Sequence, residues 1–339
     1  MLHYLKPSFA SVTAITAFVA LTGASALLPA PAGAQGVLRL GHNRTWSNPA
    51  LIIGLASGAF EKAGVKVVET EFSNPADMIT AIVSGDIDAC ATPGPNLFTA
   101  VAKGVKVKAV AILQGNNVPP ISYMVLNDSG INKMEDMRGK KAGVNNYGGN
   151  YDIYLRYWAG KHGLDPKKDM DVVVVPVPSM LLALVNRQID MVPLAAFQQA
   201  QVLQRYPGRL KTIFTYEDVM KDGVGNTDNN SLVLAMGESY IQRNRATAIK
   251  FLEGYLRAVH AVNADQKKAL DDWAKAVGNN ALRNLPAPPV LPNDGKVYAK
   301  SLQFDADQAA RFGYLDKKVD TRTMVDNSLI EVAAASMKK

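Results

Sequence analysis

The sequence contains few of the residues on which disulfide, metal and nucleophile chemistry depends. Among its 339 residues are one cysteine, Cys90, and four histidines. A single cysteine cannot form an internal disulfide, and the apolar neighbours of Cys90 predict a buried free thiol. The histidines show no metal-ligand spacing, and the sequence contains no H-E-x-x-H, G-x-S-x-G or phosphate-loop motif. We therefore expect no metal, no cofactor and no catalytic site built from a local motif.

Strong charge of either sign is also missing. Charged residues make up 20% of the chain and hydrophobic residues 48%, and the formal net charge is +7. Basic residues form no run interleaved with aromatics, so the composition predicts a soluble globular protein that does not bind nucleic acid. The small positive excess is compatible with an anionic ligand.

The first 34 residues contain no acidic side chain. They hold one basic residue, Lys6, then an apolar stretch over 12–28 and a run of small residues and prolines that ends at Ala34. This order predicts a secretory signal peptide at 1–34, cleaved near Ala34, and a periplasmic location for the mature protein. The alternative is a retained membrane anchor, because the apolar stretch approaches the length that spans a bilayer. Its many Ala, Gly, Ser and Thr residues favour cleavage.

Two segments of the sequence repeat one pattern. Residues 78–88 align with residues 180–190 without a gap, at an offset of 102 residues. In each copy an apolar strand, at 65–72 or 172–177, leads through a proline into an amphipathic helix, a turn and the pair Ile-Asp. Strands that alternate with helices in this way predict an α/β fold with parallel sheets covered on both faces. The repetition favours two related lobes.

About 305 residues follow the signal peptide, which exceeds the usual size of one core. We expect lobe 1 at 35–121, lobe 2 at 122–234, and a return to lobe 1 with C-terminal helices at 235–339. Asn74 and Pro75 form an N-cap and first-turn pair for the helix that follows them. Further helices are expected at 52–63, at 151–162, at 238–263 as one or two helices, and from residues near 305 and 323.

One segment resembles a known family. Residues 123–131, followed by residues 134–144 with Arg138-Gly139-Lys140-Lys141, are similar to a signature of extracytoplasmic solute-binding proteins of ABC importers. The similar group is the nitrate, sulfonate and taurine type, related to the thiamine-precursor binders (NMT1/THI5-like). The segments 84–88 and 189–190 occur in the order expected for that group.

The resemblance implies a type II periplasmic-binding-protein fold with two lobes, each a mostly parallel sheet flanked by helices. Two crossing segments, near 120–124 and 232–236, would join the lobes, and a small-molecule ligand would be held between them. The implied partner is an ABC permease in the inner membrane. We expect the binding protein to be a monomer.

Loops that follow strand ends are the expected binding elements, because ligands of open parallel sheets bind beyond the carboxyl ends of the strands. These loops are rich in Asn, Gly, Pro and small residues. The candidate ligand-binding residues are Asn43, Arg44, Trp46 and Ser47 in the first loop, Thr92, Pro93 and Asn96 in the second, Gln114 and Asn116 before the outward crossing, Tyr147, Gly148, Gly149 and Asn150 in the third, Phe197 in the fourth, and Asn226 and Asn229 before the return crossing.

The second loop offers donors at the start of a helix. Thr92 supplies a hydroxyl, and the backbone N–H groups of Asn96 and Leu97 are expected to be open to an anion. In the first loop, Trp46 offers an aromatic plate and Arg44 a cation; a surface turn is the structural alternative.

The third loop should bring backbone close to the ligand through Gly148 and Gly149. Sulfonate-type relatives commonly carry Gly-Ser or Gly-Thr at this place, and here Gly149-Asn150 replaces it. We expect Asn150 to cap the following helix and to donate through its amide. The flanking tyrosines favour a flatter, more aromatic ligand, whereas the carboxylate of Asp152 would compete with an anion.

The expected function is the capture of a small organic anion, an aromatic or short carboxylate or a sulfonate, without turnover. One alternative is a binder of a thiamine-precursor-like pyrimidine. Another is an exported enzyme on the same fold, although thiamine-precursor synthases use a cysteine-rich segment that Cys90 alone cannot supply. A sensing lobe of a regulator would need a fused signalling domain.

Overall fold

The computed structural model describes residues 36–43, 49–114, 120–228, 232–285, 288 and 291–338, and residues 35–339 form one compact unit. The strands are β1 Gly36–His42, β2 Val65–Glu71, β3 Ala89–Thr92, β4 Val107–Gln114, β5 Ser122–Leu126, β6 Lys141–Val144, β7 Asp171–Val174, β8 Val192–Leu194, β9 Leu210–Thr215 and β10 Leu232–Gly237. The helices before the second crossing are α1 Pro49–Ala56, α2 Ala59–Lys62, α3 Pro75–Ser84, α4 Gly94–Ala102, the 3₁₀ turn η1 Met134–Met137, α5 Asn150–Lys161, α6 Val177–Val185, α7 Ala196–Arg205 and α8 Tyr216–Val224. The helices after it are α9 Glu238–Arg243, α10 Arg245–Ala264, α11 Gln266–Val277, η2 Asn280–Asn284, α12 Ala299–Arg311, η3 Thr321–Thr323 and α13 Ser328–Ser336.

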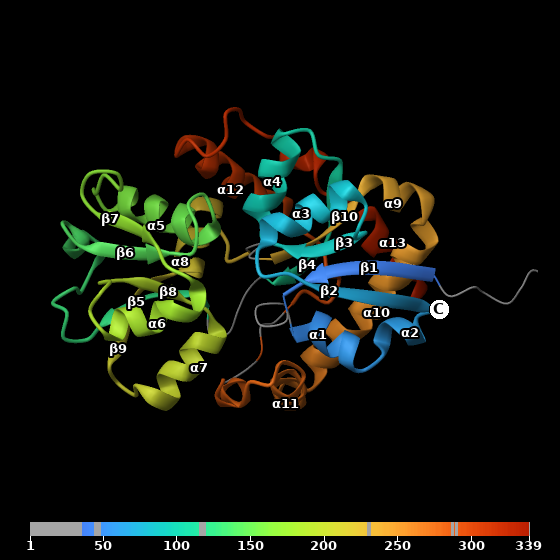
Figure 1. The fold of residues 1–339 in the computed structure, drawn as a ribbon, viewed down its shortest axis with the longest axis horizontal. Helices are drawn as coiled ribbons and strands as arrows, with labels where there is room; N and C mark the ends of the chain where they lie inside the picture. Colours follow the sequence, from blue (N-terminus) through green and yellow to red (C-terminus); the bar gives the residue numbers. More distant parts are fainter. Residues whose placement is uncertain are drawn as a thin grey trace, which may run out of the picture. The chain divides into compact units, whose positions relative to one another are not determined.

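The strands form three sheets (Figure 1). One has five strands in the order β2-β1-β3-β10-β4, one has three in the order β8-β5-β9, and β6 pairs with β7. The chain leaves the five-stranded sheet after β4 and returns to it as β10. These are the two crossings between sheets that were expected near 120–124 and 232–236, and the α/β fold class is confirmed.

The strand pairing is mixed, where mostly parallel sheets were expected. Among the described strands, β1 runs parallel to β2 and β3, and β6 runs parallel to β7. In contrast, β10 is antiparallel to β3 and β4, and β5 is antiparallel to β8 and β9. All four antiparallel pairings involve β5 or β10, the strands that follow the crossings. A strand that joins a sheet after a crossing can be antiparallel to its neighbours, and a local sequence pattern does not reveal this direction.

The repeat in the sequence is also present in the hydrogen bonding. The backbone N–H of Arg39 donates to Asp88 Oδ2 at 2.8 Å, and the N–H of Lys141 donates to Asp190 Oδ2 at 2.8 Å. Both pairs are 49 residues apart and are related by the same offset of 102. A parallel bridge between residues 142 and 191 links β6 to β8, so the strand order β7-β6-β8-β5-β9 repeats the order of the five-stranded sheet.

Some element boundaries match the expectation, and others differ from it. The helix expected at 52–63 is divided into α1 and α2, because Gly58 adopts a left-handed φ of 67° between them. Asn74 accepts a hydrogen bond from the N–H of Ala76 and Pro75 opens α3, as predicted. The region 238–263 forms two helices, α9 and α10. α12 begins at Ala299, before the expected start near 305, and the residues near 323 form only the short turn η3 ahead of α13.

One hydrophobic cluster extends across the sheets. It includes Phe98 of α4, Tyr123 of β5, Tyr154 of α5 and Leu302 of α12, all fully buried. α12 packs against α4, α5 and α8. These helices follow β3, β6 and β9, which are strands of three different sheets. This shared core explains why residues 35–339 form one unit, and the expected lobe boundaries stay a prediction.

Cys90 is buried and free, as expected, and burial raises the pKa of its thiol well above the ordinary value. None of the helices in the described part of the chain has the length and apolar content needed to cross a bilayer. Residues 1–35 lie outside the described residues, so the signal peptide also stays a prediction.

Candidate functional site

Thr92 lies at the carboxyl end of β3 and carries an unused polar atom. Its side chain is 0% exposed, and its Oγ1 has no hydrogen-bond partner among the residues that the structure describes. α4 begins two residues later, with Pro93 as its N-cap residue. Buried hydroxyl groups are normally hydrogen-bonded, so an unpartnered one beside a helix start marks a place where a ligand or water can bind.

The backbone donors expected at the start of α4 are not open. The N–H groups of Asn96 and Leu97 both donate to the carbonyl of Pro93, at 3.2 and 3.4 Å. The prediction of free N–H groups at these two residues was therefore wrong. A proline N-cap lacks a side-chain acceptor, and its carbonyl takes both bonds within the first turn. The side chain of Asn96 is half-buried.

The loop after β6 carries two more unused polar atoms. Asn145 Oδ1 and Asn150 Oδ1 are buried, and neither has a hydrogen-bond partner within the described part of the chain. Asn150 is 7% exposed. Gly148 has a left-handed φ of 73°, and Gly149 leaves no room for a Cβ, which would lie 2.7 Å from Asn146 Oδ1. The two glycines therefore let the loop turn sharply against α5.

Asn150 does not cap α5, contrary to expectation. The N-cap residue is Gly149, in an extended conformation, and Asn150 is the first residue of the helix. Its side chain is consequently free of the capping bond that was predicted for it. Asn145 was recognised only as part of the loop and was not selected as a candidate. The signal that could have found it is the repeat, because an offset of 102 places Asn145 opposite Asn43.

The carboxylate of Asp152 is compensated inside the protein. Asp152 is fully buried, and its Oδ1 accepts a hydrogen bond from Arg156 Nε at 2.7 Å. Its Oδ2 accepts the backbone N–H of Gly148 at 2.9 Å. A buried carboxylate with a paired cation and a backbone donor presents little net charge to its surroundings. The expected competition between Asp152 and a bound anion is thereby reduced, and the carboxylate instead orders the loop.

The aromatic residues of this loop are in different surroundings. Tyr147 is 54% exposed, and its hydroxyl donates to the carbonyl of Val172 at 3.0 Å. Tyr151 is half-buried, and its carbonyl accepts the Tyr123 hydroxyl at 2.6 Å. Tyr147 therefore offers an exposed ring face next to the glycines, whereas Tyr151 belongs partly to the core.

The other candidates are placed less favourably or fall outside the described residues. Asn43 follows β1, and its Nδ2 donates to the carbonyl of Phe72 at 2.9 Å. Gln114 ends β4 and is half-buried. Asn226 is exposed, and its amide bonds with Asp228 in a local turn, at 3.0 Å in each direction. Phe197 lies in α7, but its side chain is outside the description, as are Arg44, Trp46, Ser47, Asn116 and Asn229.

Within the described ranges no group of three or more His, Cys, Asp or Glu residues could hold a metal ion. His162 is the C-cap residue of α5. Of the buried polar atoms without a partner among the described residues, three lie at the end of β3 or in the segment after β6: Thr92 Oγ1, Asn145 Oδ1 and Asn150 Oδ1. An arrangement of this kind can bind a small polar molecule through hydrogen bonds.

The NMT1/THI5-like family model matches residues 49–269. The chain is 30% identical over 200 residues to the nitrate/nitrite binding protein NrtA of Synechococcus elongatus. This match covers 50% of this chain and 45% of that protein. It is 23% identical over 306 residues to a putative aliphatic sulfonates-binding protein of Bacillus subtilis, covering 87% of each. The crystal structure of the periplasmic aliphatic sulphonate binding protein SsuA from Escherichia coli superposes with a TM-score of 0.70 at 19% identity, covering 86% of this chain and 92% of that one.

Some matches have enzyme names, among them a pyrimidine phosphate synthase of Schizosaccharomyces pombe and the desulfurization enzyme DSZB. The chain spans about half the length of the nitrate/nitrite-binding relative that it matches. The family model covers well over half of the chain, and the solved sulphonate-binding protein shares its fold. The chain therefore belongs to the NMT1/THI5-like family.

Proposed function

We propose that this protein is the substrate-binding component of an ABC importer, exported to the periplasm, and that it delivers a small organic anion to a membrane permease. The observation that carries the proposal is the set of three buried polar atoms without partners, on Thr92, Asn145 and Asn150. The family membership and the binding-protein relatives support the same class of function.

The energetics favour occupation of these atoms by a ligand. A buried polar atom without a partner costs about 1–3 kcal/mol, and this cost is offset when a bound molecule supplies the missing hydrogen bond. The Thr92 hydroxyl can donate or accept. Each Asn side chain can present either its carbonyl oxygen or, after a half-turn, its NH₂ group. The three residues can therefore donate to the oxygens of an anion.

The charge around the loop supports an anionic ligand more than the sequence suggested. Asp152 is compensated by Arg156 and by the N–H of Gly148. The relatives are named for nitrate, nitrite and aliphatic sulfonates, all of which present oxygens of this kind. The exposed ring of Tyr147 beside the glycines favours a ligand with a flat face, such as an aromatic carboxylate.

A second candidate is a pyrimidine related to the thiamine precursors. The unpartnered atoms of Asn145 and Asn150 are acceptors as placed, and acceptors suit the ring amino group of such a pyrimidine. The match to a pyrimidine phosphate synthase points to the same chemistry. An enzyme is the weaker proposal, since the sulfonates-binding relative that matches 87% of this chain is named as a binding protein.

Calorimetric titration of the protein tests the proposal with four probes: nitrate, ethanesulfonate, benzoate and 4-amino-5-hydroxymethyl-2-methylpyrimidine. We expect ethanesulfonate or benzoate to bind with a micromolar or lower dissociation constant and to be recovered chemically unchanged. Binding of nitrate alone would contradict the organic part of the proposal. Binding of the pyrimidine alone would favour the second candidate. Conversion of any probe would contradict a pure binding function.

A further inference from the structure

The proposed binding loop, residues 145–150, is contacted by a distant part of the chain. Tyr314 follows α12, and a Cβ added to Gly148 would lie 3.0 Å from its side chain. Burial raises the pKa of the Tyr314 phenol above its ordinary value, and the nearby Asp152 carboxylate raises this pKa further. Because Asp152 also accepts the N–H of Gly148, Tyr314 contacts both the loop and the side chain that orders it.

A second polar contact joins the same region to the same helix. The hydroxyl of Tyr154 in α5 donates to Asp305 Oδ1 in α12 at 2.8 Å, and both residues are fully buried. Phe304 lies edge-on to Tyr157, with ring centroids 5.0 Å apart. Phe304 also lies so close to Gly223 in α8 that an added Cβ would approach its ring to 2.3 Å. α12 therefore contacts the middle of α5, one and two turns after Asn150.

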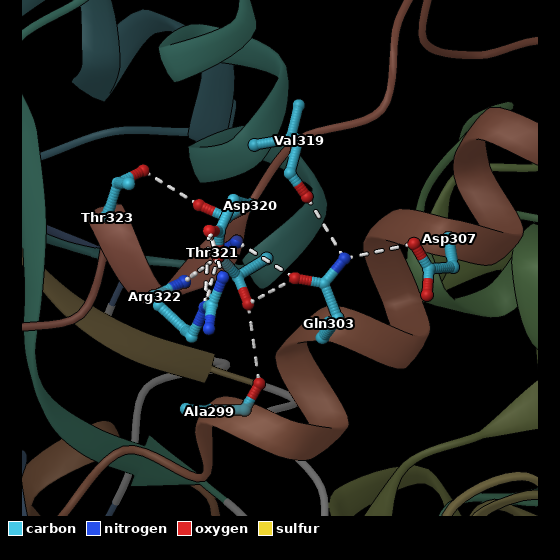
Figure 2. A network of polar contacts seen from close by, with 8 residues as sticks. All are labelled: Ala299, Gln303, Asp307, Val319, Asp320, Thr321, Arg322 and Thr323. Atoms are coloured by element: carbon cyan, nitrogen blue, oxygen red, sulfur yellow. Dashed lines mark hydrogen bonds and ion pairs between the residues drawn. The ribbon is translucent and has the colours of Figure 1, made fainter.

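The opposite side of α12 is fixed by the network in Figure 2. The N–H and hydroxyl of Thr321 both donate to Gln303 Oε1, at 2.9 and 3.0 Å. Gln303 Nε2 donates in turn to the carbonyl of Val319 at 3.0 Å and to Asp307 Oδ1 at 2.9 Å. The amide of Gln303 thereby ties α12 to the turn η3.

The residues after η3 are bonded to the five-stranded sheet. The N–H of Ala109 in β4 donates to the carbonyl of Met324 at 2.7 Å, and the N–H of Asp326 donates to the carbonyl of Ala109 at 2.9 Å. Lys108 Nζ donates to the carbonyl of Thr323 at 2.6 Å. A continuous series of hydrogen bonds and packed side chains thus leads from β4 through η3 and α12 to the loop.

We propose that residues 299–326 form a brace, which fixes residues 145–150 relative to the five-stranded sheet and so sets ligand affinity. Tyr314 and Asp305 are positioning residues of this brace, because they act through Asp152 and Tyr154 and not on the ligand. The inference rests on the proposed function only for the statement that the loop binds ligand. A spatial connection alone does not demonstrate coupling, so the test measures the loop and the affinity separately.

The first variant is Tyr314→Phe, which removes one hydroxyl and keeps the ring on Gly148. Tyr154→Phe is the second, and it removes the bond to Asp305. The matched control is Tyr157→Phe on the same helix. The Tyr157 hydroxyl donates to Asp222 in α8, outside the brace. All three variants lose a single hydroxyl from a tyrosine that packs beside α12, so a general loss of stability affects the control as well.

Hydrogen–deuterium exchange of the ligand-free proteins measures how fast the backbone amides of the loop exchange. We expect the amides of residues 148–152 to exchange about 10-fold faster in both variants, because Tyr314→Phe removes a hydroxyl beside Asp152 and Tyr154→Phe removes a buried hydrogen bond. Peptides of β1 to β3 should exchange as in the wild type, and the control should match the wild type in the loop. Equal exchange of the loop in the wild type and in Tyr314→Phe would overturn the brace.

Calorimetric titration with nitrate and ethanesulfonate reads out the affinity. We expect about 5- to 10-fold weaker binding in both brace variants, the size of effect that the loss of one polar contact produces, and less than 2-fold in the control. Faster loop exchange with unchanged affinity would overturn the claim that the brace sets affinity. If the wild type binds neither probe, the proposed function is contradicted for these ligands, while the exchange result still decides whether the brace exists.

Discussion

Two buried threonines differ in the hydrogen bonding of their hydroxyl groups. Thr92 and Thr321 are both 0% exposed, but the hydroxyl of Thr92 has no partner in the described part of the chain, whereas that of Thr321 donates to Gln303. Replacement by Val removes the hydroxyl at nearly constant shape. The comparison therefore tests the proposal that the Thr92 hydroxyl serves ligand binding, whereas the Thr321 hydroxyl serves folding.

We expect Thr92→Val to leave the free energy of unfolding unchanged or slightly higher, because no hydrogen bond is lost. Thr321→Val should lower it by about 1–2 kcal/mol. Urea unfolding measures both. Titration with whichever probe binds should show that Thr92→Val weakens binding at least 10-fold, by analogy with one lost hydrogen bond to a charged ligand. A stability loss in Thr92→Val as large as in Thr321→Val would mean that the hydroxyl is structural.

Two helical glycines predict opposite effects of the same substitution. Gly254 lies in α10, where an added Cβ would be 2.9 Å from Phe60 Cδ1 and 3.0 Å from the carbonyl oxygen of Ala59 in α2. Gly160 lies in α5, where an added Cβ would meet nothing within 4 Å. Gly254→Ala should destabilise by about 1–3 kcal/mol, because backbone atoms of α2 must shift. Gly160→Ala should stabilise by about 0.5–1 kcal/mol.

Thermal unfolding of the two glycine variants, followed by circular dichroism, checks the signs. If both variants are stabilised, α2 yields easily and the close approach of α10 to α2 is not a constraint. If both are destabilised, the end of α5 is more crowded than its open surroundings indicate.

At the scale of one element, α12 carries a carboxyl group in an apolar environment. Burial raises the pKa of Asp305 to about 8, and the hydrogen bond from Tyr154 only partly opposes this. The groups that face it include the hydroxyls of Tyr154 and Tyr216, which stay neutral below their own raised pKa values. Asp305 is thus protonated in the folded protein at neutral pH.

This placement predicts that the free energy of unfolding depends on pH. An unfolded Asp ionises near pH 3.9, so between about pH 4 and 8 the folded protein holds a proton that the unfolded chain has lost. Stability from this group is fully present below pH 4 and falls as pH rises towards 8, by up to about 1.4 kcal/mol per unit. Asp305→Asn, which cannot titrate, should remove this slope. Urea unfolding at pH 5, 6, 7 and 8 measures it, and parallel profiles for the two proteins would contradict the assignment.

The elements also show what the sequence could predict. The cap at Asn74, the repeat at an offset of 102 and the strand ends that carry polar loops depend on neighbouring residues, and they were predicted correctly. The antiparallel insertion of β10 depends on distant partners, so no local pattern indicated it. Within the candidate loops, the shift of the α5 cap to Gly149 and the bonds to Pro93 were not predicted, since both depend on single backbone angles.

At the scale of the whole molecule, the shared core predicts cooperative unfolding. The cluster that contains Phe98, Tyr123 and Leu302 joins both crossings and α12. Trp158 stacks on Phe214 within the middle of the chain, whereas Trp273 is buried in a different cluster with α10. Variants that keep only one of these tryptophans report on the two regions separately.

We expect single-tryptophan variants with Trp158 or Trp273 to unfold in urea at the same midpoint, and calorimetry to show one transition. Two midpoints separated beyond error would mean that the regions unfold independently and that α12 does not join them. The other tryptophans should be replaced by Phe, so that the aromatic packing is largely preserved.

Because β10 lies between β3 and β4, the five-stranded sheet cannot be completed during synthesis until residues 232–237 have been made. A nascent chain that stops short of residue 232 leaves uncovered the edges of β3 and β4 that β10 later pairs with. Open edges of this kind adhere to other chains. The five-stranded sheet therefore contains both the first and the last strand to be synthesised. A chaperone would matter most for this protein between the emergence of residue 114 and that of residue 237.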